Sequence, residues 1–156
     1  MSTLPAVNFQ KQSDFYQKAF AFQDFLLQFE QAEIPVYHHF SIATYARECH
    51  LPANTFVIGK VHRHAHINII SKGRVLLATP NGFQLLTAPC EFINEVGVKR
   101  VLYVLEDTTW TTVHKNLSNT QDLAKIEADV IVPEHEVNEF SAQLYASNQP
   151  LLGEYQ

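Results

Sequence analysis

The chain has 156 residues, of which 46% are hydrophobic and 17% charged, and this composition is typical of one globular domain. Its formal net charge of −5 argues against a nucleic-acid-binding protein, because such a protein needs a basic face. No apolar run approaches the roughly 18 residues that a membrane-spanning helix needs, and we expect no secretory signal at residues 1–12. Two cysteines are too few for a disulfide framework and favour a reducing compartment, whereas eight histidines are an unusually high number.

A helix is predicted over residues 13–32, because apolar side chains recur there in steps of three and four residues. This apolar stripe consists of Phe15, Ala19, Phe22, Leu26 and Phe29. Ser13 or Asp14 is expected to cap the start of the helix, and Pro35 to end it. The stripe can pack on the rest of the domain or form the seam of a homo-oligomer. Further apolar residues lie off the stripe, so the helix is apolar around more than one face, which favours the homo-oligomer.

Residues 36–114 are predicted to form β-structure. Short runs rich in Val, Ile, Thr, Tyr and Phe alternate there with turn signals, and this pattern is typical of a sandwich or barrel. The predicted strands are 44–49, 56–62, 66–71, 74–79, 83–87, 90–93, 100–105 and 109–114. Turns are predicted at residues 51–55, where Asn54 can adopt a left-handed conformation, at 72–73, and at the hairpin 80–82.

The last part of the chain is predicted to be a short helical tail. Asn119 or Thr120 can cap a helix with Ile126 on its apolar side, and Pro133 ends this helix. The more polar residues beyond Glu134 form either a second short helix or an arm that lies on a neighbouring molecule. The chain therefore divides into an N-terminal helical segment at 1–35, a β-region at 36–116 and a C-terminal helix and tail at 117–156.

The most specific local feature is a run of three histidines at alternate positions, His62, His64 and His66. Alternate residues of a strand face the same side, and imidazole is the commonest metal-ligating side chain near neutral pH, so these residues can share one ion. His62 and His66 would lie about 13 Å apart on a straight strand, and they can meet one ion only where the chain bends between them. The alternative is a histidine-lined pocket or surface that holds no metal.

At these residues the sequence resembles the cupin superfamily of small jelly-roll barrels. Residues 60–73, which end at Gly73 before a new strand, are similar to the first cupin motif, and residues 95–100 are similar to the core of the second. The resemblance covers about residues 36–116. It implies a mainly β, cupin-like jelly-roll barrel, which here carries an N-terminal α-helix and a short C-terminal helical tail. It also implies a homo-oligomer that pairs through the N-terminal helix or the barrel edges.

The first motif can be aligned in two ways. Counting back from Gly73 places His66 at the family's glutamate and His62 at its second histidine, with Lys60 at the first. Counting instead from His62 and His64 places an asparagine at the glutamate position. We prefer the Gly73 alignment, because it sets His62 and His66 on two consecutive strands across a bend.

The third ligand is then predicted at His114, because alternation within residues 110–114 places Trp110 and His114 on one face. A trio of histidines with an open position suits Zn, Fe, Mn or Ni. Arg100 stands where the second cupin motif has a ligand histidine, which argues against a metal, because a fixed cation in the pocket disfavours a second cation and favours an anionic ligand. The predicted metal ligands are therefore His62, His64, His66 and His114, and the predicted ligand-binding residues are Lys60, Arg100 and Trp110.

Longer stretches of the chain resemble small cupin-like proteins encoded by tailed bacteriophages. These stretches are residues 34–40, 45–48, 58–62, 71–73, 88–90 and 106–114. The resemblance implies a phage product that acts in the host cytoplasm or in the virion, and it supplies no activity. Three functions stay open: a protein with a histidine-bound divalent metal and a small anionic ligand, with or without catalysis; a virion or assembly component that uses the barrel as a scaffold; and a metal-free protein that binds or sequesters a nucleotide or sugar.

Overall fold

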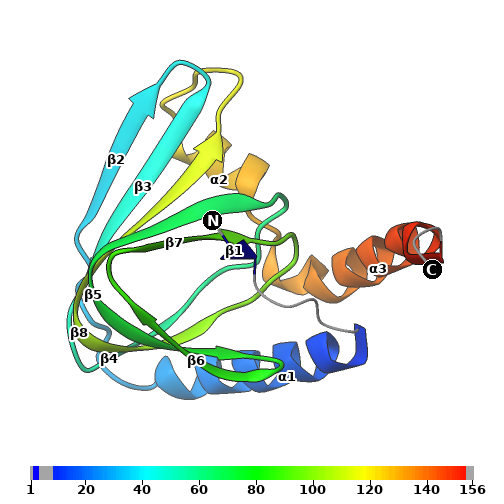
Figure 1. Cartoon of the computed structure of the whole chain (residues 1–156), viewed down its shortest axis with the longest axis horizontal. Helices are drawn as coiled ribbons and strands as arrows, with labels where there is room; N and C mark the ends of the chain where they lie inside the picture. The colour runs from blue at the N-terminus through cyan, green and yellow to red at the C-terminus, as the bar shows by residue number, and fades with distance from the viewer. Residues whose placement is uncertain (1, 4–8, 154–156) are drawn as a thin grey trace.

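The computed structural model describes residues 2–3 and 9–153. It is mainly antiparallel β-structure, with one helix between the short first strand and the second, and further helices after the last strand, which confirms the predicted fold class. The elements are β1 (Ser2–Thr3), α1 (Phe9–Leu26), β2 (Val36–Ser41), β3 (Thr44–Leu51), β4 (Thr55–Ile58), β5 (His66–Thr79), β6 (Gly82–Thr87), β7 (Cys90–Asn94), β8 (Val101–Lys115), α2 (Leu123–Val130), a 3-10 turn (Glu134–Glu136) and α3 (Val137–Gly153). Figure 1 shows the sheet curving around an interior, with α1 along one side and α3 projecting away from it.

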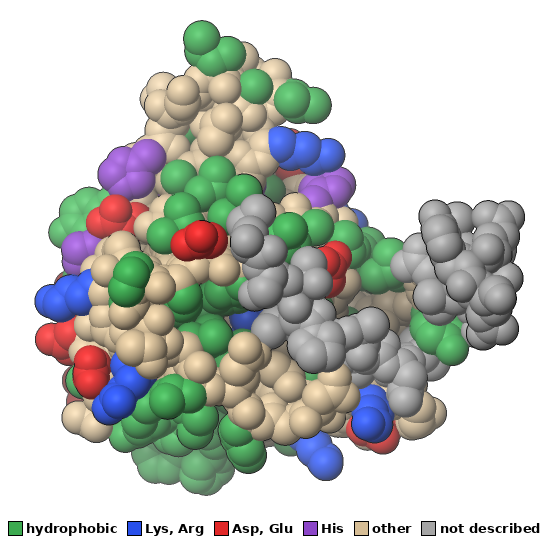
Figure 2. Space-filling view, viewed as in Figure 1, with side chains coloured by type: hydrophobic (Ala, Val, Ile, Leu, Met, Phe, Trp, Pro, Cys, Tyr) green, Lys and Arg blue, Asp and Glu red, His purple; other side chains and the backbone are tan. Residues whose placement is uncertain are grey.

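The strands form one eight-stranded sheet in the order β1-β7-β5-β8-β3-β2, with β4 added to β8 and β6 added to β5. The two long strands β5 and β8 are its centre, and they pair antiparallel from Ile67 opposite Val113 to Ala78 opposite Val101. The predicted hairpin at residues 80–82 connects β5 to β6, and Asn54 adopts the predicted left-handed conformation, with a φ of 60°. On the face seen in Figure 2, acidic and basic side chains are interspersed over the outer surface.

The predicted turn at residues 72–73 is wrong, because β5 continues through it as one bent strand. The register with β8 shifts between Ile70 and Val75, and the buried side of the strand changes there from even-numbered to odd-numbered residues. Gly73 has a φ of +94°, and a Cβ at this position would collide with Thr108 of β8. The glycine that suggests a turn in the sequence therefore marks a bulge where two long strands approach closely. The two strands predicted at residues 100–105 and 109–114 are likewise one continuous strand, β8, which pairs with β5 on both sides of the bulge.

The N-terminal helix lies earlier in the chain than predicted. It begins at Phe9 instead of Ser13 and ends at Leu26, where the side chain of Gln31 donates hydrogen bonds to the carbonyl oxygens of Leu26 (2.9 Å) and Phe29 (2.7 Å). These bonds, together with the backbone bond from Phe29 N to Leu26 O (3.1 Å), close the turn that follows the helix. The predicted apolar stripe is right in part: Ala19 is buried at 2% exposed, but Tyr16, which lies off the stripe, is the deeply buried aromatic residue of the helix at 1% exposed.

Two apolar clusters hold the fold together. The larger one fills part of the interior of the sheet and consists of Cys49, Leu51, Ile70, Val75, Leu77, Leu86, Phe92, Leu102, Val104 and Trp110. The smaller one joins Tyr16 of α1 to Val61, Val132 and Val137, so it attaches both helical segments to the outside of the sheet. The helix therefore packs on its own chain along most of its length, as far as Phe22 against Phe56 of β4, whereas Phe25 near its end and Leu27 and Phe29 just after it are exposed.

The C-terminal tail is helical and crosses the chain just before β5. Asp122, and not the predicted Asn119 or Thr120, caps α2, and its side chain accepts hydrogen bonds from the backbone of the first turn. After α2 the backbone bonds to residues 61–63, because Arg63 N donates to Val130 O (2.8 Å) and Val132 N donates to Val61 O (2.9 Å). The residues beyond Glu134 form the second helix that the sequence left open, α3. Among the described helices, none is long and apolar enough to cross a membrane.

Candidate metal centre

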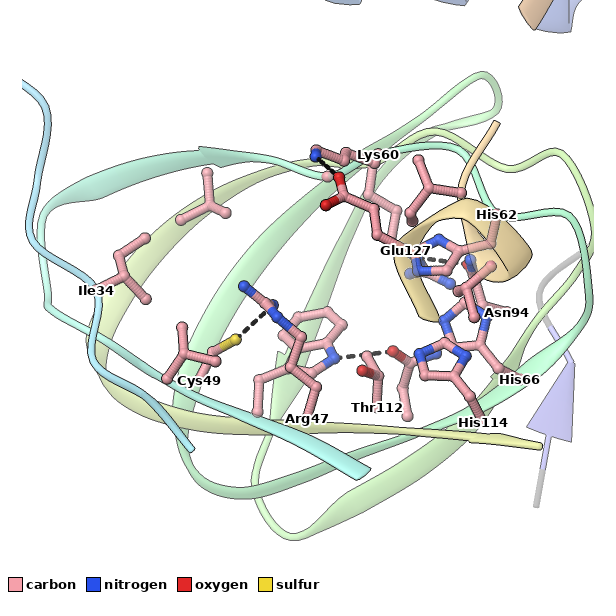
Figure 3. Close-up of a pocket in the computed structure, with 18 of the residues that line it drawn as sticks. Ile34, Arg47, Cys49, Lys60, His62, His66, Asn94, Thr112, His114 and Glu127 are labelled. Carbon is pink, nitrogen blue, oxygen red and sulfur yellow. Dashed lines mark hydrogen bonds and ion pairs between the residues drawn. The ribbon is translucent and has the colours of Figure 1, made fainter. Parts of the chain in front are cut away.

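A cavity of about 700 Å³ lies between the curved sheet and α2. Strands β3, β5 and β8 contribute their inward-facing side chains to it, and α2 contributes Leu123, Ile126 and Glu127. As Figure 3 shows, Ile34 and Cys49 lie toward one end of the cavity, and His62, His66 and His114 are gathered at the other. The pocket therefore combines an apolar part with one concentrated group of nitrogen ligands, as small-molecule sites commonly do.

Three of the four predicted metal ligands lie together. The candidate ligand atoms of His62, His66 and His114 are all within 4.8 Å of one another. The ring centroids are 4.2 Å apart for His62 and His66, 4.6 Å for His66 and His114, and 5.3 Å for His62 and His114. These distances bring the three imidazoles close enough to share a single ion once the nearly parallel rings of His62 and His114 turn toward it.

Backbone pairing explains this grouping. His66 is the first residue of β5 and His114 the second-last of β8, and the pairing of Ile67 with Val113 sets these two histidines across the same pair of strands. His62 comes from the segment before β5. The predicted strand 56–62 ends already at Ile58, and His62 forms an isolated antiparallel bridge with Ile131 after α2.

His64, the fourth predicted ligand, lies outside the group. The chain bends at Arg63 and His64, and the side chain of His64 is exposed. The bend gives His62 and His66 the close approach that a straight strand would prevent. The geometry corresponds to the alignment counted from Gly73, which pairs His62 with His66 and leaves His64 out.

The three grouped histidines are neutral at pH 7. Burial, which disfavours the charged imidazolium, lowers the pKa of His62 to about 3 and the pKa values of His66 and His114 to about 4. Their mutual proximity acts in the same direction on His62 and His114. Neutral imidazoles offer a free lone pair, which is the form that binds a metal ion.

Two further features of the histidine side chains suit metal ligation. The Nδ1 atom of His66 lies 3.3 Å from the carbonyl oxygen of His64, so it can donate there and leave Nε2 as the ligand atom. The Nδ1 atom of His62 is buried and makes no hydrogen bond of regular geometry with the described residues, although the backbone of Lys60 lies near enough to act on the pKa of this imidazole. A buried polar atom without a partner is costly, and a metal ion would satisfy it. The donor set therefore fits a divalent ion such as Zn, Fe, Mn or Ni.

The predicted ligand-binding residues also line the cavity. Arg100 is 8% exposed, donates from Nε to Asn94 Oδ1 (2.5 Å), and stacks its guanidinium over the ring of Phe92. Burial lowers the pKa of Arg100 to about 9, so it stays positively charged at pH 7. Trp110 donates from its indole nitrogen to Asn68 Oδ1 (2.8 Å), and Lys60 forms an ion pair with Glu127 of α2.

Sequence reasoning missed two charged residues of the cavity, Arg47 and Glu127. Arg47 follows Tyr45 and precedes Cys49 on the inward-facing side of β3, and both of those neighbours are buried. An arginine in a row of inward apolar positions is a signal that alternation could have shown. Glu127 had no such signal, because its place depends on how α2 crosses the barrel.

The fold and the buried histidine group define a β-barrel protein with an internal candidate metal centre. No protein-family model and no curated protein sequence matches the chain. Solved structures of similar fold include cupin-domain proteins. A cupin-2 domain containing protein from Shewanella frigidimarina is 14% identical, with 61% of this chain and 92% of that chain covered and a TM-score of 0.43. For KdgF from Halomonas sp. the identity is 13%, the coverage 61% and 88%, and the TM-score 0.48; for ectoine synthase from P. lautus they are 10%, 65% and 75%, and 0.49.

Proposed function

We propose that this chain is a cupin-type barrel protein that binds one divalent metal ion through His62, His66 and His114. The observation that carries the proposal is the group of three neutral imidazoles, buried at His66 and His114 and half-buried at His62, whose ligand atoms lie within 4.8 Å of one another inside a cavity of about 700 Å³. Three protein ligands leave a coordination position open, which is typical of sites that act on a bound small molecule.

The surrounding residues support a site for a small molecule. When bound, a divalent ion supplies Lewis-acid polarisation of a ligand oxygen. Trp110 and Leu51 give the cavity an apolar wall that excludes water, and Asn94 holds Arg100 beside the histidines through its side-chain oxygen. Glu127, the carboxylate that lines the cavity, is paired with Lys60 and is not part of the histidine group.

The proposal also covers where the protein acts and whether it forms a homo-oligomer. The resemblance to phage-encoded cupin-like proteins supports a role in a bacterial host cytoplasm or in a virion. The homo-oligomer predicted through the N-terminal helix or the barrel edges stays a proposal. The exposed side chains of Phe25, Leu27 and Phe29 at the end of α1 are consistent with it.

Elemental analysis of protein purified without a histidine tag tests the metal site. We expect about one ion per chain, either as purified or after incubation with Zn²⁺ and desalting. The double variant His62→Ala/His66→Ala should lose the ion, and the matched control His50→Ala/His64→Ala, in which both histidines are exposed, should keep it. Stoichiometric metal in the first variant, or none in the wild type, contradicts the proposal. The second result would direct the search to metal-free binding of nucleotides, sugars or virion proteins.

A further inference from the structure

The four arginines of the chain divide into two pairs with different surroundings. Arg63 and Arg74 each lie near a glutamate, with Arg63 Nη2 3.9 Å from Glu136 and Arg74 Nη2 3.2 Å from Glu106. Arg47 and Arg100 both line the cavity, and neither forms an ion pair with any residue that the structure describes. The two unpaired guanidinium groups are therefore concentrated in one place, the candidate metal cavity.

Arg100 is a buried cation with unused hydrogen-bonding capacity. Its Nε atom donates to Asn94, but Nη1 and Nη2 are buried and have no partner among the described residues. The guanidinium is close enough to the histidine group to lower the pKa values of His62 and His66 by charge repulsion. A buried charge with two free donors is expensive unless a ligand supplies the missing acceptors. A carboxylate does so with matching geometry, because its two oxygens fit the planar fork of arginine.

The hydrogen-bond partner of Arg47 is a weak acceptor, and an anion in its place would be a stronger one. Its Nη1 atom lies 2.7 Å from the sulfur of Cys49, a neutral thiol that accepts hydrogen bonds poorly. Burial raises the pKa of the Cys49 thiol, so the partner is not a thiolate at pH 7. In Figure 3, Arg47 lies between Cys49 and the histidine group; the residue lines the cavity and is exposed.

The charges of the cavity contrast with those of the whole chain. Lys60 and Glu127 pair with each other at the cavity, which leaves two positive charges on Arg47 and Arg100 in a protein whose net charge is −5. A divalent ion held by three neutral imidazoles would add two more. Such a concentration of positive charge among apolar walls attracts an anionic ligand.

We propose that the cavity binds a small organic dicarboxylate. One carboxylate pairs with Arg100 beside the histidine group, the other pairs with Arg47 in place of the Cys49 thiol, and the hydrocarbon body spans the part of the cavity between the two arginines. The inference deepens the proposed metal function by naming the ligand class of the same cavity, but the two arginine contacts do not need the ion.

Calorimetric titration of EDTA-treated protein tests the inference. The probes are straight-chain dicarboxylates from succinate to suberate, each compared with the monocarboxylate of the same chain length. At least one dicarboxylate should bind roughly tenfold or more tightly than its monocarboxylate, because it makes one more charge-assisted contact with an arginine. No difference for any chain length overturns the inference.

Variants of the two arginines test which arginine binds which carboxylate of the ligand. Arg47→Gln should bind the preferred dicarboxylate no better than the monocarboxylate, whereas Arg100→Gln should weaken both acids by roughly tenfold or more. Arg74→Gln, which removes an arginine that pairs with Glu106 outside the cavity, is the matched control and should bind as the wild type does. Arg47 is exposed, so its replacement leaves folding intact even if Arg100→Gln does not fold. Unchanged binding by Arg47→Gln overturns the assignment.

Repeating the titration with zinc-loaded protein separates this inference from the metal proposal. Protein that holds zinc but binds no dicarboxylate in either form contradicts the inference and leaves the metal site standing. Protein that binds a dicarboxylate but takes up no zinc supports the inference and contradicts the metal site. Binding in both forms, tighter with zinc, supports both proposals, because the ion adds positive charge beside Arg100.

Discussion

The rings of His62 and His66 lie 4.2 Å apart although both come from one short run of alternating histidines. The bend at Arg63 and His64 produces this approach, and backbone hydrogen bonds to residues 130–132 hold the bent segment. The metal site thus depends on the C-terminal tail as well as on the strands. His114 completes the group from the far end of β8.

Replacing His114 with alanine tests whether this third histidine is needed for metal binding. The variant should bind Zn²⁺ far more weakly than the wild type, by more than the 10- to 100-fold that loss of an outer-shell partner costs. Competition with a chromogenic zinc chelator measures this affinity. His135→Ala, at an exposed position, is the control and should keep the wild-type affinity. Equal affinity of the wild type and His114→Ala would remove this residue from the ligand set.

The candidate metal ligands could be predicted from the sequence more accurately than the bounds of the strands and helices that carry them. Spacing from Gly73 and alternation before His114 led to the observed trio, because both depend on local β-geometry that residue order records. The place of Glu127, by contrast, follows from long-range packing of α2, which leaves no local pattern. Gly73 suggested a turn because a glycine that permits a positive φ looks the same in a turn and in a bulge. Periodicity also did not reveal where α1 ends. The helix ends at Leu26 because of contacts such as the hydrogen bonds from Gln31, and these depend on residues outside the apolar pattern.

A matched pair of glycine variants tests the bulge between β5 and β8. Gly73→Ala should destabilise the protein by roughly 2–4 kcal/mol, because it adds a clash with Thr108 to the strain of a positive φ. Gly82→Ala, in the hairpin, also has a positive φ but meets nothing within 4 Å, so it should cost only the strain, about 1 kcal/mol. Urea unfolding measures both. Equal losses would show that the close approach at Gly73 does not contribute.

The stability of metal-free protein should fall as the pH is lowered from about 6.5 to about 4. The grouped histidines have pKa values of about 3 to 4 in the folded chain, against an ordinary value of 6.5. Between these values the unfolded chain binds protons that the folded chain does not, so acid favours unfolding. Each histidine contributes at most about 1.4 kcal/mol per pH unit.

Urea unfolding of EDTA-treated protein between pH 4.5 and 8 measures this dependence. His62→Gln removes one buried titrating group, so its stability should change less steeply with pH below 6.5, and it should parallel the wild type above pH 7, where the grouped histidines are neutral in both states. A wild-type stability that stays constant between pH 6.5 and 4.5 would mean that the three imidazoles are more hydrated than their burial indicates.

Removing the buried charge of Arg100 should stabilise the metal-free, ligand-free protein. The guanidinium is 8% exposed, has no ion-pair partner among the described residues, and leaves two buried nitrogens without acceptors. Arg100→Met keeps much of the side-chain volume over Phe92 and removes the uncompensated charge, at the cost of one hydrogen bond to Asn94. We expect a gain of about 1 kcal/mol or more in the free energy of unfolding, measured in urea at pH 7. The same variant should bind dicarboxylates poorly, and stability gained together with binding lost is the pattern of a residue kept for its ligand. A loss of stability would indicate instead that Arg100 is a structural part of the barrel.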